Sequence, residues 1–142
     1  LFPYTTLFRS RHDHIGYNYR MPNINAALGC AQLENLDRYV ADKRETAACY
    51  AEFFKGKEDI TFFTEPADCK SNYWLNAVVL KDKAAQLDFL EYTNDHGVMT
   101  RPVWELMNRL PMFEHCETDG LENTEWLADR VVNIPSSVRL DK

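Results

Sequence analysis

The chain has 142 residues, 45% of them apolar and 27% charged, proportions that are ordinary for one compact globular domain. Its formal net charge of −6 argues against a nucleic-acid partner, which needs a basic face, and no run approaches the roughly eighteen apolar residues of a membrane span. Its four cysteines are too scattered for a zinc pair and fit a reduced, cytoplasmic protein.

The first stretch, Leu1 to Ser10 (LFPYTTLFRS), differs in character from the rest of the chain. It has no initiating Met, no sustained apolar core and no small-residue cleavage site, so it does not match a signal peptide. It resembles a translated sequencing-adapter string, and we interpret residues 1–11 as a non-native or disordered leader. The alternative is a natural strand followed by a turn. We expect the whole chain to be a fragment cut at both ends.

A polar, aromatic loop over residues 12–22 precedes a long helix, which we expect over residues 23–55. Pro22 suits the first helical position, and Gly56 is a typical C-terminal stop. The charged side chains, Arg44 among them, fall on the arc opposite a broad apolar arc, so the helix should pack between two layers. A mid-helix glycine costs about 1 kcal/mol relative to Ala, so Gly29 predicts the close approach of another backbone. The helical cysteines are interpreted as small buried hydrophobes: Cys30 and Cys49.

Residues 56–142 are predicted to form a small α+β domain. Trp74, inside an apolar, β-branched run, is expected in the core. The elements expected in chain order are a strand at 60–64, a buried strand at 73–80, a helix capped by Asp82 and ending near Asn94, a strand at 98–103, a short helix at 104–113, a helix from Asn123 to about Val132 and an extended segment at 133–137.

The run GYNYRMPNINAALGCAQLENLDRYVADKR, residues 16–44, resembles the DegT/DnrJ/StrS family of sugar-nucleotide aminotransferases. These are pyridoxal-phosphate (PLP) enzymes of the aspartate-aminotransferase fold, with a pattern G-[FY]-N-[YF]-R-[ML] followed by A-A-L-G-x-x-Q-L. Every such position is filled from Gly16 to Leu33. Weaker matches extend from residue 12 to the end: Ser71–Trp74, His96–Trp104, Leu110–Phe113 and Asn133–Ser137. The resemblance implies an α+β fold, the C-terminal small domain of a fold-type I PLP transferase, in which a long N-terminal helix leads into a small sheet covered by shorter helices.

The same resemblance implies a PLP site at Asn18, Arg20 and Tyr17. In the family the Asn of this motif reaches the PLP phosphate of the neighbouring subunit, which implies a homodimer through the loop and the long helix. An amide before a helix start can donate to a phosphate oxygen, but it can also stabilise its own turn. Arg20 can brace a phosphate or a carboxylate, or form a salt bridge to Glu34. Aromatic residues such as Tyr17 are more often loop-packing residues than site residues.

Arg101 and Trp104 are the candidate substrate-binding residues. An Arg at a strand end followed by an aromatic suits a nucleotide diphosphate with a base or sugar stacked nearby, and the resemblance implies part of the sugar-nucleotide pocket here. The competing interpretation is a surface Arg beside a core Trp. No metal site is predicted, because His12 and His14 have no ligand partner at metal spacing.

No catalytic residue is predicted inside this chain. PLP transamination needs a lysine for the Schiff base and an acid at the pyridine nitrogen, and the resemblance places both upstream of Gly16. The longer protein would move an amino group, from glutamate, to a nucleotide-linked keto-sugar for surface polysaccharide, while the fragment alone would be inactive. Two alternatives stay open: a PLP-dependent sugar dehydratase of the same family, with a His in place of the lysine, and a non-catalytic regulatory protein on the same scaffold.

Overall fold

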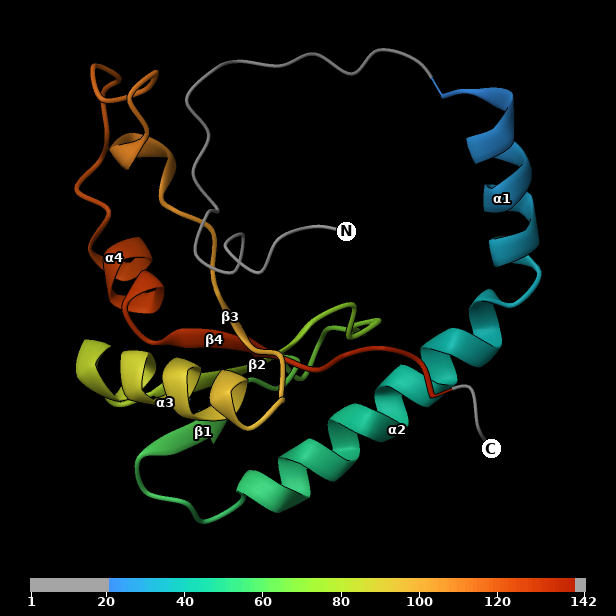
Figure 1. Cartoon of the computed structure of the whole chain (residues 1–142), viewed down its shortest axis with the longest axis horizontal. Helices are drawn as coiled ribbons and strands as arrows, with labels where there is room; N and C mark the ends of the chain where they lie inside the picture. The colour runs from blue at the N-terminus through green and yellow to red at the C-terminus, as the bar shows by residue number, and fades with distance from the viewer. Residues whose placement is uncertain (1–20, 140–142) are drawn as a thin grey trace.

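The structure is a computed structural model that describes residues 21–139 (Figure 1). The helices and strands in chain order are α1 (Asn23–Leu33), α2 (Leu36–Phe54), β1 (Ile60–Phe62), β2 (Asn76–Leu80), α3 (Lys83–Asp95), β3 (Arg101–Pro102), the 3₁₀ turn η2 (Met107–Arg109), α4 (Glu122–Ala128) and β4 (Val131–Ile134). Helices combined with one small antiparallel sheet confirm the predicted α+β class. No helix within residues 21–139 has the length and apolarity needed to cross a bilayer.

The four strands form one sheet in the order β1-β2-β4-β3, with every neighbouring pair antiparallel. The last strand in the chain, β4, therefore lies inside the sheet between β2 and β3. The predicted helix from Asn123 to Val132 is wrong in its second half, because α4 ends at Ala128. Val131–Ile134 alternates half-buried and buried residues, the period of two that a strand requires.

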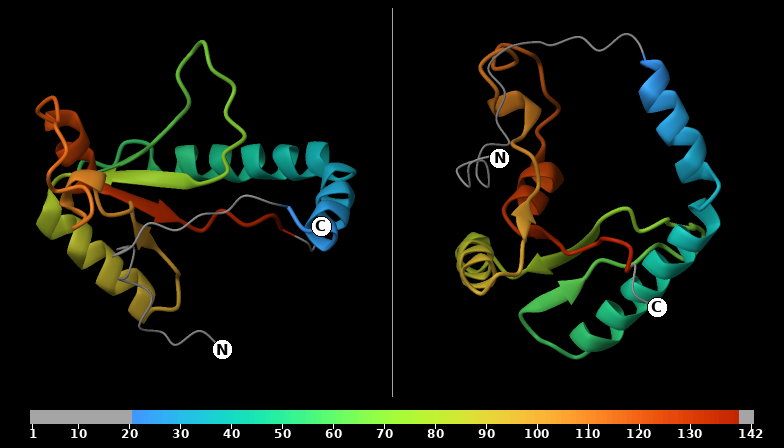
Figure 2. Two further views of the ribbon diagram at one scale, coloured as in Figure 1. Left: turned by 90° about the horizontal axis from the view of Figure 1, so that it is seen from above. Right: turned by 45° about the vertical axis from the view of Figure 1, so that its right-hand side comes forward.

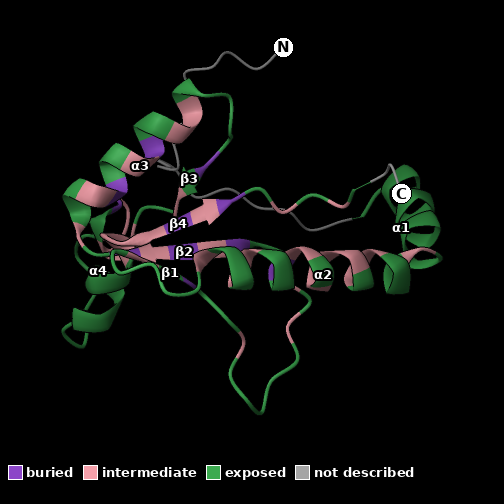
Figure 3. Cartoon of the chain, turned by 90° about the horizontal axis from the view of Figure 1, so that it is seen from below, coloured by how far each residue is buried: buried purple, intermediate pink, exposed green. Residues whose placement is uncertain are grey.

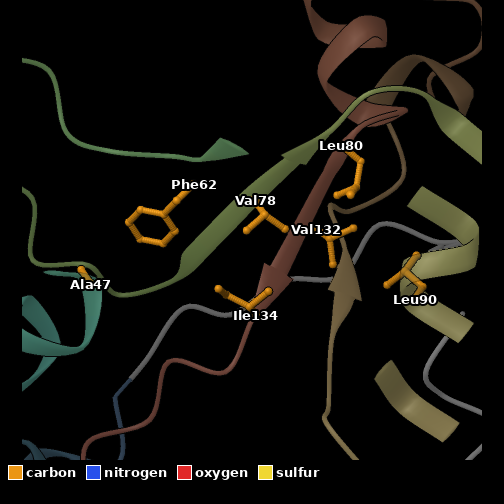
Figure 4. Packing of buried hydrophobic residues seen from close by; sticks show 7 residues of the cluster. All are labelled: Ala47, Phe62, Val78, Leu80, Leu90, Val132 and Ile134. Carbon is orange, nitrogen blue, oxygen red and sulfur yellow. The ribbon is translucent and has the colours of Figure 1, made fainter. Parts of the chain in front are cut away.

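The core lies on one face of this sheet (Figure 4). Val78 of β2 lies opposite Val132 of β4, and both are completely buried. Ala47 of α2 and Leu90 of α3 belong to the same buried cluster, so both helices pack against this face. The other members of the cluster are Phe62, Leu80 and Ile134.

The predicted long helix is interrupted at Glu34 and Asn35, which separate α1 from α2. The side-chain amide of Asn35 donates to the carbonyl of Ala31 at 3.1 Å, and the backbone of Asn35 leaves helical geometry at φ −108° and ψ 1°. Asn competes in this way with the helix's own hydrogen bonds. After the break α1 points away from the sheet (Figure 1), and all its residues are exposed (Figure 3).

Two expectations about the long helix are wrong for the described chain. A Cβ added at Gly29 would meet nothing within 4 Å, so no other backbone within residues 21–139 approaches it. Cys30 and Cys49 are exposed rather than buried, as are the other two cysteines of the chain. The reason is the break before α2: it turns α1 off the sheet, while α2 buries only a narrow stripe centred on Ala47.

Helix α3 follows the predicted pattern closely. Asp82 is its N-cap and accepts a hydrogen bond from the backbone N–H of Ala85 at 2.8 Å. Gln86, with no exposed surface, donates to the carbonyls of Ala128 and Val131, both at 2.9 Å. This amide thereby fixes α3 against the junction of α4 and β4.

Candidate functional site

The predicted cofactor residues Tyr17, Asn18 and Arg20 lie outside the described residues. The predicted substrate residue Arg101 lies at one end of the sheet. At this end β2 begins, β4 ends and β3 begins. Arg101 of β3 pairs with Asn133 of β4, which in turn pairs with Ala77 of β2. These three residues form a row across the sheet, on the face opposite the core because they alternate with Val132 and Val78.

Arg101 and Trp104 are both on the surface. The Arg101 guanidinium contacts only the sulfur of Met99, at 3.3 Å, and no carboxylate within residues 21–139 pairs with it. Trp104 is 66% exposed, so the competing interpretation of a core Trp is wrong. No cation–π contact joins this Arg to this Trp in the described part of the chain. The structure therefore leaves both groups accessible without bringing their side chains together.

A buried polar network fixes the backbone just before Arg101. The hydroxyl of Thr100, a residue only 1% exposed, lies 2.6 Å from the Thr93 hydroxyl and accepts from the Asn94 amide at 3.0 Å. The same amide also donates to the Thr100 carbonyl at 3.2 Å. The start of β3, and with it the Cα of Arg101, is thereby anchored to the end of α3.

The sequence did not predict a two-point ion pair near this end of the sheet. Arg44, assigned to the solvent-facing arc, donates from its two terminal nitrogens to the two carboxylate oxygens of Glu65 at 2.6 and 3.0 Å. Arg44 also donates to the Ser71 carbonyl, and Glu65 accepts from the Ser71 N–H, both at 2.5 Å. The two side chains thus tie α2 to both sides of the loop that connects β1 and β2.

This ion pair shifts the titration of both of its members. The hydrogen bond from Arg44, followed by that from the Ser71 N–H, lowers the pKa of Glu65 from 4.5 to about 2. The hydrogen bond to Glu65 is also the main cause that raises the pKa of Arg44. Neither group is therefore poised to exchange a proton near neutral pH, and their role is to hold the loop.

Beyond this ion pair the loop turns into β2 through Tyr73 and Trp74. Tyr73 has a positive φ of 45°, and its N–H donates to the Ser71 hydroxyl at 2.9 Å. The Trp74 N–H donates to the side chain of Asn72 at 3.0 Å, and its carbonyl accepts from Lys43 at 3.3 Å. Trp74 is 64% exposed, so its predicted place in the core is wrong: the turn rotates it out before β2 begins at Asn76.

The architecture is similar to that of solved aminotransferases. The sugar aminotransferase CalS13 from Micromonospora echinospora has a similar structure, with a TM-score of 0.75 and 25% identity over 89% of this chain and 33% of its own. The predicted fold is thereby confirmed: the chain has the architecture of part of a fold-type I PLP aminotransferase. The model of the DegT/DnrJ/EryC1/StrS aminotransferase family matches residues 5–142, and the chain belongs to that family.

Two curated relatives match most of this chain. The GDP-perosamine synthase of Escherichia coli O157:H7 is 32% identical over 127 residues, which are 88% of this chain and 34% of the relative. The putative pyridoxal phosphate-dependent aminotransferase EpsN of Bacillus subtilis (strain 168) is 32% identical over 130 residues, 89% of this chain and 34% of the relative. The chain therefore spans about a third of the length of these curated relatives.

Proposed function

We propose that this chain is the C-terminal third of a PLP-dependent aminotransferase that transfers an amino group, from glutamate, to a nucleotide-linked keto-sugar. The family match over residues 5–142 carries the proposal. One relative is named as a PLP-dependent aminotransferase and another as a synthase of GDP-perosamine, which favours amination over the dehydration considered above. The biological role of the enzyme would be the synthesis of amino sugars for surface polysaccharide.

The donor set of the predicted cofactor loop fits PLP. Asn18, Arg20 and Tyr17 all carry N–H or O–H donors, which match the acceptor oxygens of a phosphate. The loop leads into the N-terminus of α1, where Pro22 provides no side-chain cap, so N–H groups of the first turn remain for an anion. When bound, PLP would supply the electron sink for the amino-group transfer. This chain's own part would be to hold the phosphate and to orient the substrate.

For the substrate, the proposal uses Arg101 and Trp104. A guanidinium without a carboxylate partner in the described chain can hold a diphosphate in two hydrogen bonds. The exposed indole of Trp104 offers an apolar face to a sugar or a base. Because Thr100 anchors the start of β3, the backbone that carries the Arg101 side chain is held in a fixed position.

The apolar side chains of α1 support a homodimer through the loop and this helix. Ile24 is 82% exposed, Leu28 60% and Leu33 67%. An eleven-residue helix of which no residue is buried by the described chain is marginal in water, so α1 requires a covering surface. In the assembled protein Leu28→Glu should convert the dimer to monomer in sedimentation, while Cys30→Glu, on the opposite side of the same helix, should not. A Leu28→Glu protein that sediments as a dimer would remove α1 from the interface.

A chimera tests the activity. Residues 12–142 would replace the corresponding third of the E. coli GDP-perosamine synthase, which supplies the lysine and the acid. We expect glutamate-dependent amination of the nucleotide-linked keto-sugar, and no activity from the 142-residue chain alone. Asn18→Ala should weaken PLP binding about tenfold, the effect of one hydrogen bond to a charged group, while Asn25→Ala in α1 should not. A folded, PLP-loaded chimera that transfers no amino group would refute the proposed function.

We place the protein in the cytoplasm. The four cysteines are free and exposed, which suits a reducing compartment. Fractionation of cells that express the full-length protein tests this placement, and recovery in an oxidising compartment would contradict it.

A further inference from the structure

Trp74 combines an exposed side chain with a backbone that is held on both sides. Its N–H donates to Asn72 and its carbonyl accepts from Lys43, yet 64% of the residue is open to solvent. Its segment, between β1 and β2, projects from the sheet (Figure 2, left). A large aromatic ring on a fixed backbone loses little freedom when a ligand stacks on it, which is why such rings concentrate at binding sites.

The residue before it, Tyr73, is held in a conformation that aromatic residues rarely adopt. Its φ is 45°, in the left-handed region. Its hydroxyl accepts from the Glu65 N–H at 3.2 Å, and the Arg44 guanidinium lies 5.6 Å from its ring centroid. Backbone strain of this kind persists only where the surroundings enforce it, and it is concentrated at ligand-binding sites. The strained turn is what rotates Trp74 outward.

Lys43 supplies a positive charge at the base of this turn. Two of its three N–H donors go to the carbonyls of Trp74 and Ser136, at 3.3 and 2.5 Å. Within residues 21–139 no carboxylate lies within ion-pair distance of it, whereas its neighbours Asp42 and Arg44 pair with Arg139 and Glu65. One donor and a full charge therefore remain for an anion.

We propose that Trp74 and Lys43 form a nucleotide-binding pair, with the indole stacked on the base and the ammonium group paired with a phosphate. The inference rests on the proposed function and deepens it, since it names the residues that would read the nucleoside diphosphate of the sugar substrate. An aromatic face with a nearby cation is the arrangement that binds a base and its phosphate.

Calorimetric titration of the 142-residue chain with GDP, UDP and dTDP tests the stacking. We expect saturable binding that Trp74→Leu weakens roughly tenfold or more and that Trp74→Phe largely keeps, because only the latter retains a ring face. The matched control is Trp126→Ala, which removes a partly exposed indole that lies over Arg130 at the other end of β4. The inference is overturned by a chain that binds none of the three nucleotides, or by Trp74→Leu binding as tightly as the parent.

The second arm tests the charge. The parent chain should prefer GDP to guanosine, Lys43→Met should abolish most of that preference, and Lys43→Arg should retain it. A preference unchanged in Lys43→Met would overturn the role of Lys43. If Trp74→Leu instead lowers self-association in sedimentation without changing nucleotide binding, Trp74 is a protein contact and the inference fails.

The chimera separates the two proposals. If the chimera transfers the amino group and Trp74→Leu leaves its KM for the nucleotide sugar unchanged, the proposed function is supported and the nucleotide-binding pair is refuted. Alternatively, the chain binds nucleotides in a Trp74-dependent manner while the chimera transfers no amino group. That result would support the nucleotide-binding pair and refute the proposed function.

Discussion

The two terminal nitrogens of Arg44 donate in parallel to the two carboxylate oxygens of Glu65, which joins the middle of α2 to the loop after β1. The Arg44 and Glu65 side chains are 33% and 22% exposed, so the pair is only partly shielded from water. The pair stabilises the loop through its geometry, because the same two side chains also bind the backbone N–H and carbonyl of Ser71. The position of the turn that carries Tyr73 and Trp74 depends on this arrangement.

Arg44→Lys should loosen this loop without unfolding the chain. A lysine keeps the charge but cannot make two parallel hydrogen bonds, so Ser71 loses a donor. We expect Lys-C to cut after Lys70 roughly three- to tenfold faster, since proteolysis follows local opening. Arg38→Lys, at an exposed position of the same helix, is the control and should leave the rate unchanged.

The same ion pair gives stability a defined pH dependence. Because folding lowers the pKa of Glu65 from 4.5 to about 2, its contribution is complete above pH 4.5 and is lost as pH falls toward 2. In urea unfolding across this window, Glu65→Gln should show a shallower loss of stability than the parent chain. Glu91→Gln, at an exposed position of α3, should follow the parent. Identical curves for Glu65→Gln and the parent would contradict the lowered pKa.

Asn76→Val should stabilise the chain. Asn76 is 1% exposed, and neither its side-chain oxygen nor its side-chain nitrogen has a hydrogen-bond partner within residues 21–139. Burial of an amide without partners costs about 1 to 3 kcal/mol, and valine also suits a strand. Chemical denaturation should therefore give a free energy of unfolding higher by about 1 kcal/mol or more. Thr46→Val removes a buried hydroxyl that also has no partner in the described part of the chain, and it should act in the same direction. A loss of stability in both variants would mean that these groups are satisfied.

Gln86→Leu should destabilise the chain by about 2 to 3 kcal/mol. The amide of Gln86 donates to the carbonyls of Ala128 and Val131, and leucine would leave these partly buried carbonyls without that donor. Asp88→Asn, at an exposed position of the same helix, should change the free energy of unfolding by less than about 0.5 kcal/mol. Equal stabilities for these two variants would show that Gln86 does not anchor α3.

Local pattern was enough to predict α3. Asp82 caps it and His96-Gly97 ends it, because the signals for both helix ends depend on residues within one turn. Strand β2 was predicted for a similar reason, its run of apolar and β-branched residues, although it starts three residues later than expected. Family membership was also readable, since GYNYRM and the small-residue helix after it form a contiguous motif.

What the sequence determined by itself is the α+β class, the family and the elements whose signals lie within a few residues. Only the tertiary structure decided that Val131–Ile134 is an inner strand, that Arg44 pairs with Glu65 and that Trp74 faces solvent. The physical reason is distance along the chain. Arg44 meets a residue twenty-one positions away, β4 pairs with a strand that begins more than fifty residues earlier, and Trp74 is turned outward by contacts from α2. Periodicity records which residues share a face, but not which distant segment will cover that face.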